Sequence, residues 1–355
     1  GGVIFAAPLR RERRAEAERA ALRQRQSKAL VLLERAQASL QDAHSGSDSK
    51  RTLELADEAL QRAEEAAAAG EALGADAPAH VTREVAAIRL GARRLRAETL
   101  ARGTPSEREA ARHLFRGLLE ETGDPDLRLL LGRLELEGGH CRAALAQFNE
   151  VLAQEPDRAE AFYYRAEAHR RAGAAHYALL DYERALRDRS KLVAVRAPKV
   201  LVGRALAHLA LGETSKARED LSEANKLDLR EPLLRLGRAE LYRAEGRLED
   251  ALTELAFGAR TFPRVARLRH AAGRGWIRAG DPARAQAELD AAAALGSDPA
   301  VLVARARLAA LLGRDEAAQS DLAEAAERTL PEDPARAQLR LVQARLLRVQ
   351  GRERE

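Results

Sequence analysis

The chain has 355 residues, of which 46% are hydrophobic, only 3% are aromatic and 32% are charged, and none is methionine. Alanine, leucine, arginine and glutamate dominate, which is typical of helices that pack closely through small residues and argues against a sheet-rich fold. A single cysteine, Cys141, excludes an intramolecular disulfide and a multi-cysteine metal site. We therefore expect an all-α protein whose stability comes from packing.

Residues 1–8 form an apolar stub, far shorter than the roughly 20 apolar residues that span a bilayer. Residues 1–30 hold eight basic and three acidic side chains and so account for the whole net charge of +5. Three interpretations are open: a solvated helix start, the end of a membrane span beside anionic lipid, or a nucleic-acid-binding segment. We set nucleic acid aside and keep membrane attachment through the N-terminus open. The compartment, cytoplasmic or membrane-tethered, stays undecided.

Residues 9–75 predict a long helix followed by a helical hairpin. Leu9 to about His44 contains no glycine or proline and carries leucines and alanines at helical spacing, so it predicts one helix that caps the rest of the chain or forms a stalk. Residues 76–123 predict a divergent hairpin whose second helix lies between Gly103 and Gly123.

Residues 124–355 carry a regular repeat. Glycines follow apolar helical stretches at intervals of 33 to 39 residues, at Gly139, Gly173, Gly212, Gly246, Gly280, Gly313 and Gly351. An alanine comes five or six residues after each complete one, at Ala144, Ala178, Ala217, Ala251, Ala285 and Ala318. A large apolar residue comes four residues later, at Phe148, Tyr182, Leu221, Leu255, Leu289 and Leu322. This pattern predicts helical hairpins, because glycine ends a helix in the left-handed conformation and alanine lets two helices approach.

The repeat resembles the tetratricopeptide repeat, a 34-residue helix-turn-helix unit with small residues at its eighth and twentieth positions. The eighth positions here are Gly132, Ala166, Ala205, Ala239, Gly273, Ala306 and Ala344, and the twentieth are the alanines above. The resemblance implies an α-solenoid of about six repeats with a C-terminal capping helix. Longer inter-repeat loops are expected at residues 190–198 and 329–334.

Charge pairs support this register. Four repeats carry an arginine at the seventh position and an acid 16 residues later: Arg165 with Asp181, Arg204 with Asp220, Arg238 with Glu254, and Arg305 with Asp321. We expect each pair to bridge the two helices of its hairpin, where a forked guanidinium can meet a carboxylate. Ala272 with Glu288 is an exception to the rule.

The sequence contains no motif for catalysis or for a cofactor. It lacks a phosphate-binding glycine loop, a dinucleotide fingerprint, a His-Glu-x-x-His motif and a Gly-x-Ser-x-Gly motif, and its eight histidines are isolated. We therefore expect no catalytic residues, no metal site and no cofactor.

The resemblance implies that the first helices line a concave groove, with positions two, five, nine, twelve and thirteen facing into it. The residues that we expect there are Arg133, Tyr163, Tyr164, Glu167, Leu206, Glu240, Arg267, Arg274, Arg278, Arg307, Arg345 and Arg348. The family's best-defined subtype grips a terminal carboxylate through paired Asn and Lys. Asn149 and Asn225 are not at groove positions, so we expect no such clamp.

Two functions follow from this reading. The first is a non-catalytic scaffold that binds a segment of another protein, with acidic segments favoured where the arginines gather. The second is the repeat region of a membrane-anchored bacterial serine/threonine kinase, whose region downstream of the membrane span the chain resembles in order: apolar stub, basic helix, helical repeats. No kinase motif occurs in these residues, and membrane sidedness stays open.

Overall fold

The computed structural model describes residues 6–45, 48–73, 79–187, 197–296, 298–327 and 334–349, and within these ranges it has seventeen helices and no strand. The chain divides into two compact units with their boundary between Gly123 and Asp124, here called the N-terminal unit and the C-terminal unit. The predicted all-α class is confirmed. The inter-repeat loops expected at residues 190–198 and 329–334 lie mostly outside the described residues.

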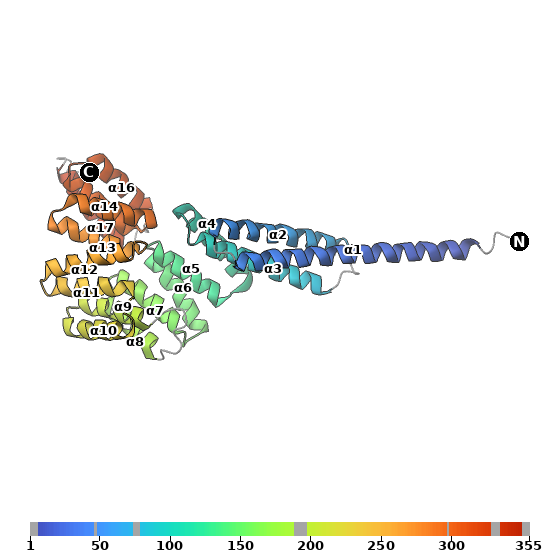
Figure 1. Cartoon of the computed structure of the whole chain (residues 1–355), viewed down its shortest axis with the longest axis horizontal. Coiled ribbons are helices and arrows are strands. Elements are labelled where there is room, and N and C mark those ends of the chain that lie inside the picture. The colour runs from blue at the N-terminus through green and yellow to red at the C-terminus, as the bar shows by residue number, and fades with distance from the viewer. Residues whose placement is uncertain are drawn as a thin grey trace. The chain divides into compact units, whose positions relative to one another are not determined.

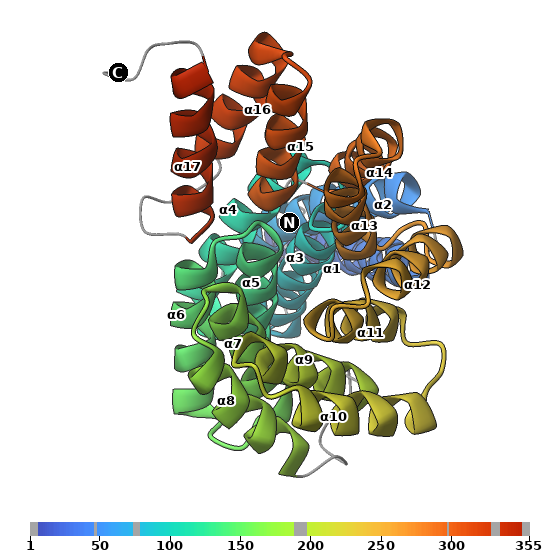
Figure 2. The same cartoon turned by 90° about the vertical axis from the view of Figure 1, so that its left-hand side faces the viewer.

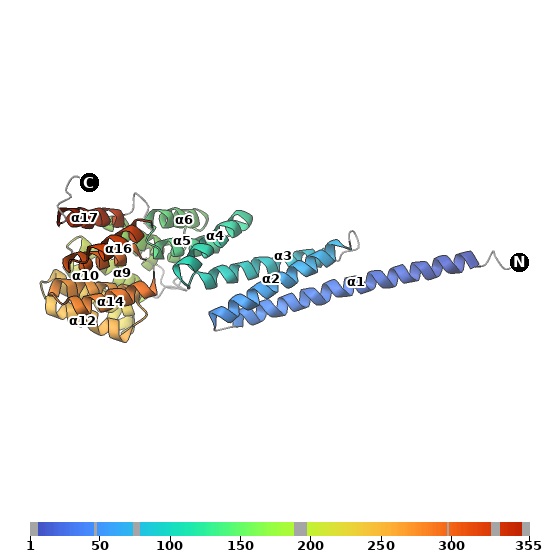
Figure 3. The same ribbon diagram turned by 90° about the horizontal axis from the view of Figure 1, so that it is seen from above.

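The N-terminal unit consists of α1 (Ala6–Ser45), α2 (Ser49–Glu71), α3 (Ala79–Leu100) and α4 (Pro105–Thr122). Figures 1 and 3 show α1, α2 and α3 side by side, with α1 continuing past the other two toward its N-terminal end. Their core includes Leu33 of α1, Ala63 of α2 and Val85 of α3, which are all buried. The predicted long helix is confirmed.

Local signals at the ends of α4 explain its limits. Thr104 and Glu107 form a capping box, in which the Thr104 backbone N–H donates to Glu107 at 2.6 Å, and Pro105 occupies the first turn. Gly123 ends the helix in the left-handed conformation, with φ of 64°. No described helix of either unit is both long and apolar enough to cross a membrane.

The C-terminal unit is a series of six helical hairpins and one closing helix, α17, that packs against α15 and α16. Its helices are α5 (Pro125–Glu137), α6 (Cys141–Gln154), α7 (Ala159–Arg171), α8 (Ala175–Arg187), α9 (Ala197–Ala210), α10 (Thr214–Leu227), α11 (Pro232–Ala244), α12 (Leu248–Thr261), α13 (Ala266–Ala279), α14 (Pro282–Leu295), α15 (Pro299–Leu311), α16 (Asp315–Glu327) and α17 (Pro334–Val349).

The hairpins stack into a curved solenoid. In Figure 2 the first helices α7, α9, α11 and α13 lie on the inside of the curve, and the second helices α8, α10, α12 and α14 lie on the outside. Each hairpin contacts the next, as in repeat proteins generally. The predicted α-solenoid is confirmed.

Glycine makes each hairpin turn possible. The six turn glycines from Gly139 to Gly313 have φ between 69° and 85°, where a side chain would be strained. Gly351, the last of the predicted series, lies outside the described residues.

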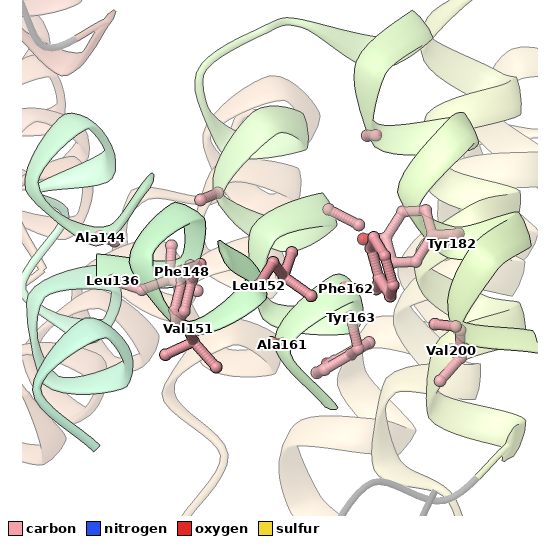
Figure 4. Packing of buried hydrophobic residues seen from close by; sticks show 14 of the residues in the cluster. Leu136, Ala144, Phe148, Val151, Leu152, Ala161, Phe162, Tyr163, Tyr182 and Val200 are labelled. Carbon is pink, nitrogen blue, oxygen red and sulfur yellow. The ribbon is translucent and has the colours of Figure 1, made fainter. Parts of the chain in front are cut away.

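The spacing of small and large residues sets the packing within and between hairpins. Figure 4 shows Phe148 and Tyr182 in the core, and neither ring has exposed surface. Phe148 packs within its own hairpin, because a Cβ added at Gly132 would lie 2.5 Å from its ring. Tyr182 packs on the next hairpin, because a Cβ at Gly203 of α9 would lie 2.7 Å from three of its atoms. Small residues therefore admit large ones from both sides.

We predict that Gly203→Ala destabilises the protein. Although alanine is the better helix former by about 1 kcal/mol, the added methyl group meets the rigid, buried ring of Tyr182. The expected net loss in the free energy of unfolding is about 1–3 kcal/mol, measured by urea denaturation followed by circular dichroism. Gly117→Ala in α4 is the control, since its Cβ would meet nothing nearer than 3.6 Å. Equal gains in stability for both variants would contradict this packing.

Candidate functional site

Paired charges join the two helices of three hairpins. The Arg165 guanidinium donates through Nε and Nη2 to the two oxygens of Asp181 at 2.8 and 2.7 Å. Arg204 meets Asp220 in the same way at 2.9 and 2.5 Å, and Arg305 meets Asp321 with its Nε donating at 2.8 Å. The three aspartates are buried. These pairs fix the height of one helix against the other in each hairpin.

Where the acid is glutamate, the arginine comes from one turn earlier. Arg235 donates to Glu254 at 2.8 Å and Arg269 donates to Glu288 at 2.8 Å, both across 19 residues. Arg238, the partner that the sequence rule assigned to Glu254, lies 3.9 Å away and donates to Asn225 instead. Glutamate is one methylene longer than aspartate and reaches this earlier position. The same geometry explains why Ala272 needs no charge.

The curve of the C-terminal unit closes on itself through a second kind of contact. Arg267 of α13 donates to Glu167 of α7 at 3.1 Å, across 100 residues of sequence. Glu167 also accepts from Arg170 at 3.0 Å and from the Tyr182 hydroxyl at 2.5 Å. A Cβ added at Gly139 would lie 3.1 Å from Pro299, so the turn before α6 touches the start of α15. Hairpins far apart in sequence therefore meet around the groove.

The buried Glu167 is held ionised by its partners. Burial favours the neutral acid, but Arg170 and Arg267 outweigh it and hold the pKa of Glu167 well below its ordinary value. Burial and the Glu167 charge raise the pKa of Tyr182 well above that of an exposed tyrosine. Tyr163 is only 2% exposed and belongs to the same core. Glu167 and Tyr163, both predicted for the groove surface, are thus largely covered residues.

Two pockets occupy the groove between α5 and α15. The first, of about 410 Å³, is lined by Arg133, Tyr164, Lys199 and Arg267 among others. The Arg133 guanidinium lies 5.1 Å from the Tyr164 ring centre, as in a cation–π contact. The second, of about 390 Å³, is lined by residues of α7, α9, α11, α13 and α15, including the predicted Leu206, Glu240, Arg267 and Arg274.

A third pocket, here called the C-terminal pocket, lies between α13, α15 and α17 and holds about 320 Å³. Three predicted residues, Arg274, Arg278 and Arg307, line it together with His270. The side chains of Arg345 and Arg348, which the sequence also predicted for this half of the groove, lie outside the described residues. A smaller apolar pocket of about 240 Å³ beside Leu252 and Leu255 shares Arg274 and Arg278 as its rim.

Two groove residues, His270 and Lys199, were missing from the prediction. His270 stands at the fifth position of its repeat and Lys199 at the second, both among the positions that the resemblance directs into the groove. Burial and the neighbouring Arg274 and Arg267 lower the pKa of His270 to about 4, although Asp298 opposes this. Its imidazole is therefore neutral near pH 7. Within the described residues no group of His, Cys, Asp and Glu side chains is arranged to hold a metal ion.

No protein-family model matches the sequence, and no curated protein matches it. Among solved structures, the chain is similar to the human IFIT1 dimer with PPP-AAAA (TM-score 0.53, 15% identity, covering 90% of this chain and 77% of that one). It is also similar to yeast Tom70 (0.46, 14%, 91% and 82%) and to a tetratricopeptide repeat protein from Parabacteroides merdae (0.45, 18%, 67% and 93%). The hairpins described above, with their left-handed glycine turns and small-to-large contacts, give the chain the fold of tetratricopeptide repeat proteins.

We predict that Glu167→Gln lowers stability in a pH-dependent way. At pH 7 the variant leaves Arg170 and Arg267 without their anion, and the free energy of unfolding should fall by about 3–5 kcal/mol. Because the folded-state pKa lies below the ordinary value near 4.5, ionised Glu167 stabilises the fold above that pH, and this contribution is lost as pH falls toward the folded-state pKa. Urea denaturation at several pH values measures the difference. The control is Glu150→Gln, an exposed site on α6. A difference between wild type and Glu167→Gln that stays constant down to pH 3 would refute this role.

We also predict that Arg235→Gln costs more stability than Arg238→Gln. The first change leaves the half-buried Glu254 without its 2.8 Å donor, whereas the second removes a contact to a neutral amide. The expected difference is about 1 kcal/mol in the free energy of unfolding. Equal losses in thermal and urea denaturation would instead favour the separation of 16 residues.

Proposed function

We propose that the C-terminal unit is a non-catalytic scaffold that binds a segment of another protein along its concave groove. One observation carries this proposal: three pockets line the inner face and share residues, with Arg267 common to the first two and Arg274 and His270 common to the last two. A continuous series of pockets suits an elongated ligand, extended or helical, better than a small molecule.

The charges along the groove favour an acidic segment at its C-terminal end. Arg274, Arg278 and Arg307 all line the C-terminal pocket, and their guanidinium groups can grip carboxylates through two parallel hydrogen bonds. The first pocket offers Tyr164 beside Arg133, an amphipathic surface of the kind that anchors peptides. Binding should weaken as salt is added, because exposed charges are screened.

The test compares fluorescent peptide libraries, one acidic and one basic, by fluorescence anisotropy. The triple variant Arg274→Glu, Arg307→Glu, Arg345→Glu should bind the acidic library at least about tenfold more weakly than the wild type, a change of about 1.4 kcal/mol. The matched control carries Arg187→Glu, Arg260→Glu and Arg314→Glu, which alter exposed arginines that line none of the pockets described. Unchanged affinity in the groove variant would remove the groove assignment.

As the alternative, we propose that the chain is the docking region of a membrane-anchored bacterial serine/threonine kinase. The apolar residues 1–8 and the basic excess in residues 1–30 support this proposal. The genomic reading frame upstream of Gly1 provides the test. A membrane span and kinase motifs in that frame would support the proposal, and a start codon directly before Gly1 would overturn it.

A further inference from the structure

The C-terminal pocket differs from the rest of the groove in its charge balance. No aspartate or glutamate is among the residues that line it, whereas Glu240 and Asp298 line the neighbouring pocket of about 390 Å³. Three guanidinium groups enter it, from Arg274 and Arg278 of α13 and Arg307 of α15. The remaining lining is mostly apolar and includes Ile277, Val303 and Leu341. The pocket therefore gathers positive charge against an apolar wall.

Other arginines of the groove already have anionic partners. Arg170 and Arg267 share Glu167, and Arg243 donates to Glu240 at 2.6 Å. Within the described part of the chain, Arg274, Arg278 and Arg307 form no ion pair.

The surroundings of Arg274 are electrostatically unfavourable for a cation. Its pKa is lowered by burial and by the positive charges of Arg278, Arg243 and Arg307, against the opposing effect of Glu240. The guanidinium of Arg305, which has Asp321 as its partner, shows the opposite direction of shift. Arginines held together without an anion gain most from a ligand that brings negative charge.

His270 adds a neutral group to the same pocket. Its Nε2 atom is buried and has no hydrogen-bond partner in the described structure. A buried imidazole nitrogen without a partner costs free energy, and an oxygen-rich ligand can supply that partner. The imidazole therefore provides a second, independent sign of a polar ligand.

We propose that the C-terminal pocket binds a phosphorylated side chain of the partner segment. This inference rests on the proposed function, since it places the phosphoryl group on a peptide in the groove. A phosphoryl group carries a charge of about −1.5 to −2 at pH 7 and offers three acceptor oxygens. A single carboxylate carries one negative charge and two oxygens, and so compensates the three guanidinium groups less completely. The apolar wall beside the arginines can hold the residue that follows.

Three degenerate peptide libraries test the proposal with the full chain. They share random flanks and carry phosphoserine, glutamate or serine at the fixed centre, and binding is read by fluorescence anisotropy. We expect the phosphoserine library to bind about tenfold more tightly than the glutamate library, which corresponds to one good charge-assisted contact. Inorganic phosphate at millimolar concentration should weaken the binding of the phosphoserine library more than that of the serine library.

The triple variant Arg274→Gln, Arg278→Gln, Arg307→Gln identifies the site. These side chains are exposed, so the fold should persist, which the circular dichroism spectrum and melting temperature verify. The variant should lose the preference for phosphoserine over glutamate. The control Arg187→Gln, Arg260→Gln, Arg314→Gln removes the same charge from exposed positions elsewhere and should keep the preference within twofold.

Each other outcome has a definite meaning. Equal binding of the phosphoserine and glutamate libraries, or a preference that survives in the groove variant, overturns the inference and leaves a peptide-binding groove in place. Failure of all three libraries to bind overturns the proposed function as well. Tighter binding of a 5′-triphosphorylated oligoadenylate than of the phosphoserine library would also overturn the inference, in favour of a nucleic-acid ligand.

Discussion

The ion pair between Glu167 and Arg267 determines the shape of the C-terminal unit. A carboxylate that is 3% exposed is stable only when cations and hydrogen-bond donors surround it, and here they come from α7, α8 and α13. Satisfying Glu167 therefore requires the solenoid to curve until its second and fifth hairpins meet. That curvature brings the arginines of α13 and α15 to the same pocket.

The parts of the fold that depend on neighbouring residues could be predicted from the sequence. A glycine turn, an alanine and a large apolar residue recur because each hairpin needs them locally, and the aspartate pairs follow from the facing of two adjacent helices. The closure by Arg267 could not be predicted. It results from small rotations between successive hairpins that add up over 100 residues, and no periodic pattern records their sum.

The candidate site was predictable to a similar extent. Arg274 and Arg307 came from following the ninth position of each repeat, and both line the C-terminal pocket. His270 was missed because the fifth position was not followed in the same way. Tyr163 was placed on the groove surface because its position faces inward, but the closed curve covers that part of α7. Register predicts direction, whereas exposure depends on how tightly the solenoid winds.

The contact between α7 and α13 also changes how the repeats come apart. In an open array of repeats each hairpin touches only its neighbours, so unravelling can start at one end and stop at any hairpin. Here a tie joins hairpins that have two others between them, α9 with α10 and α11 with α12. Those two cannot fray while the tie holds, and the middle of the array melts as one cooperative block.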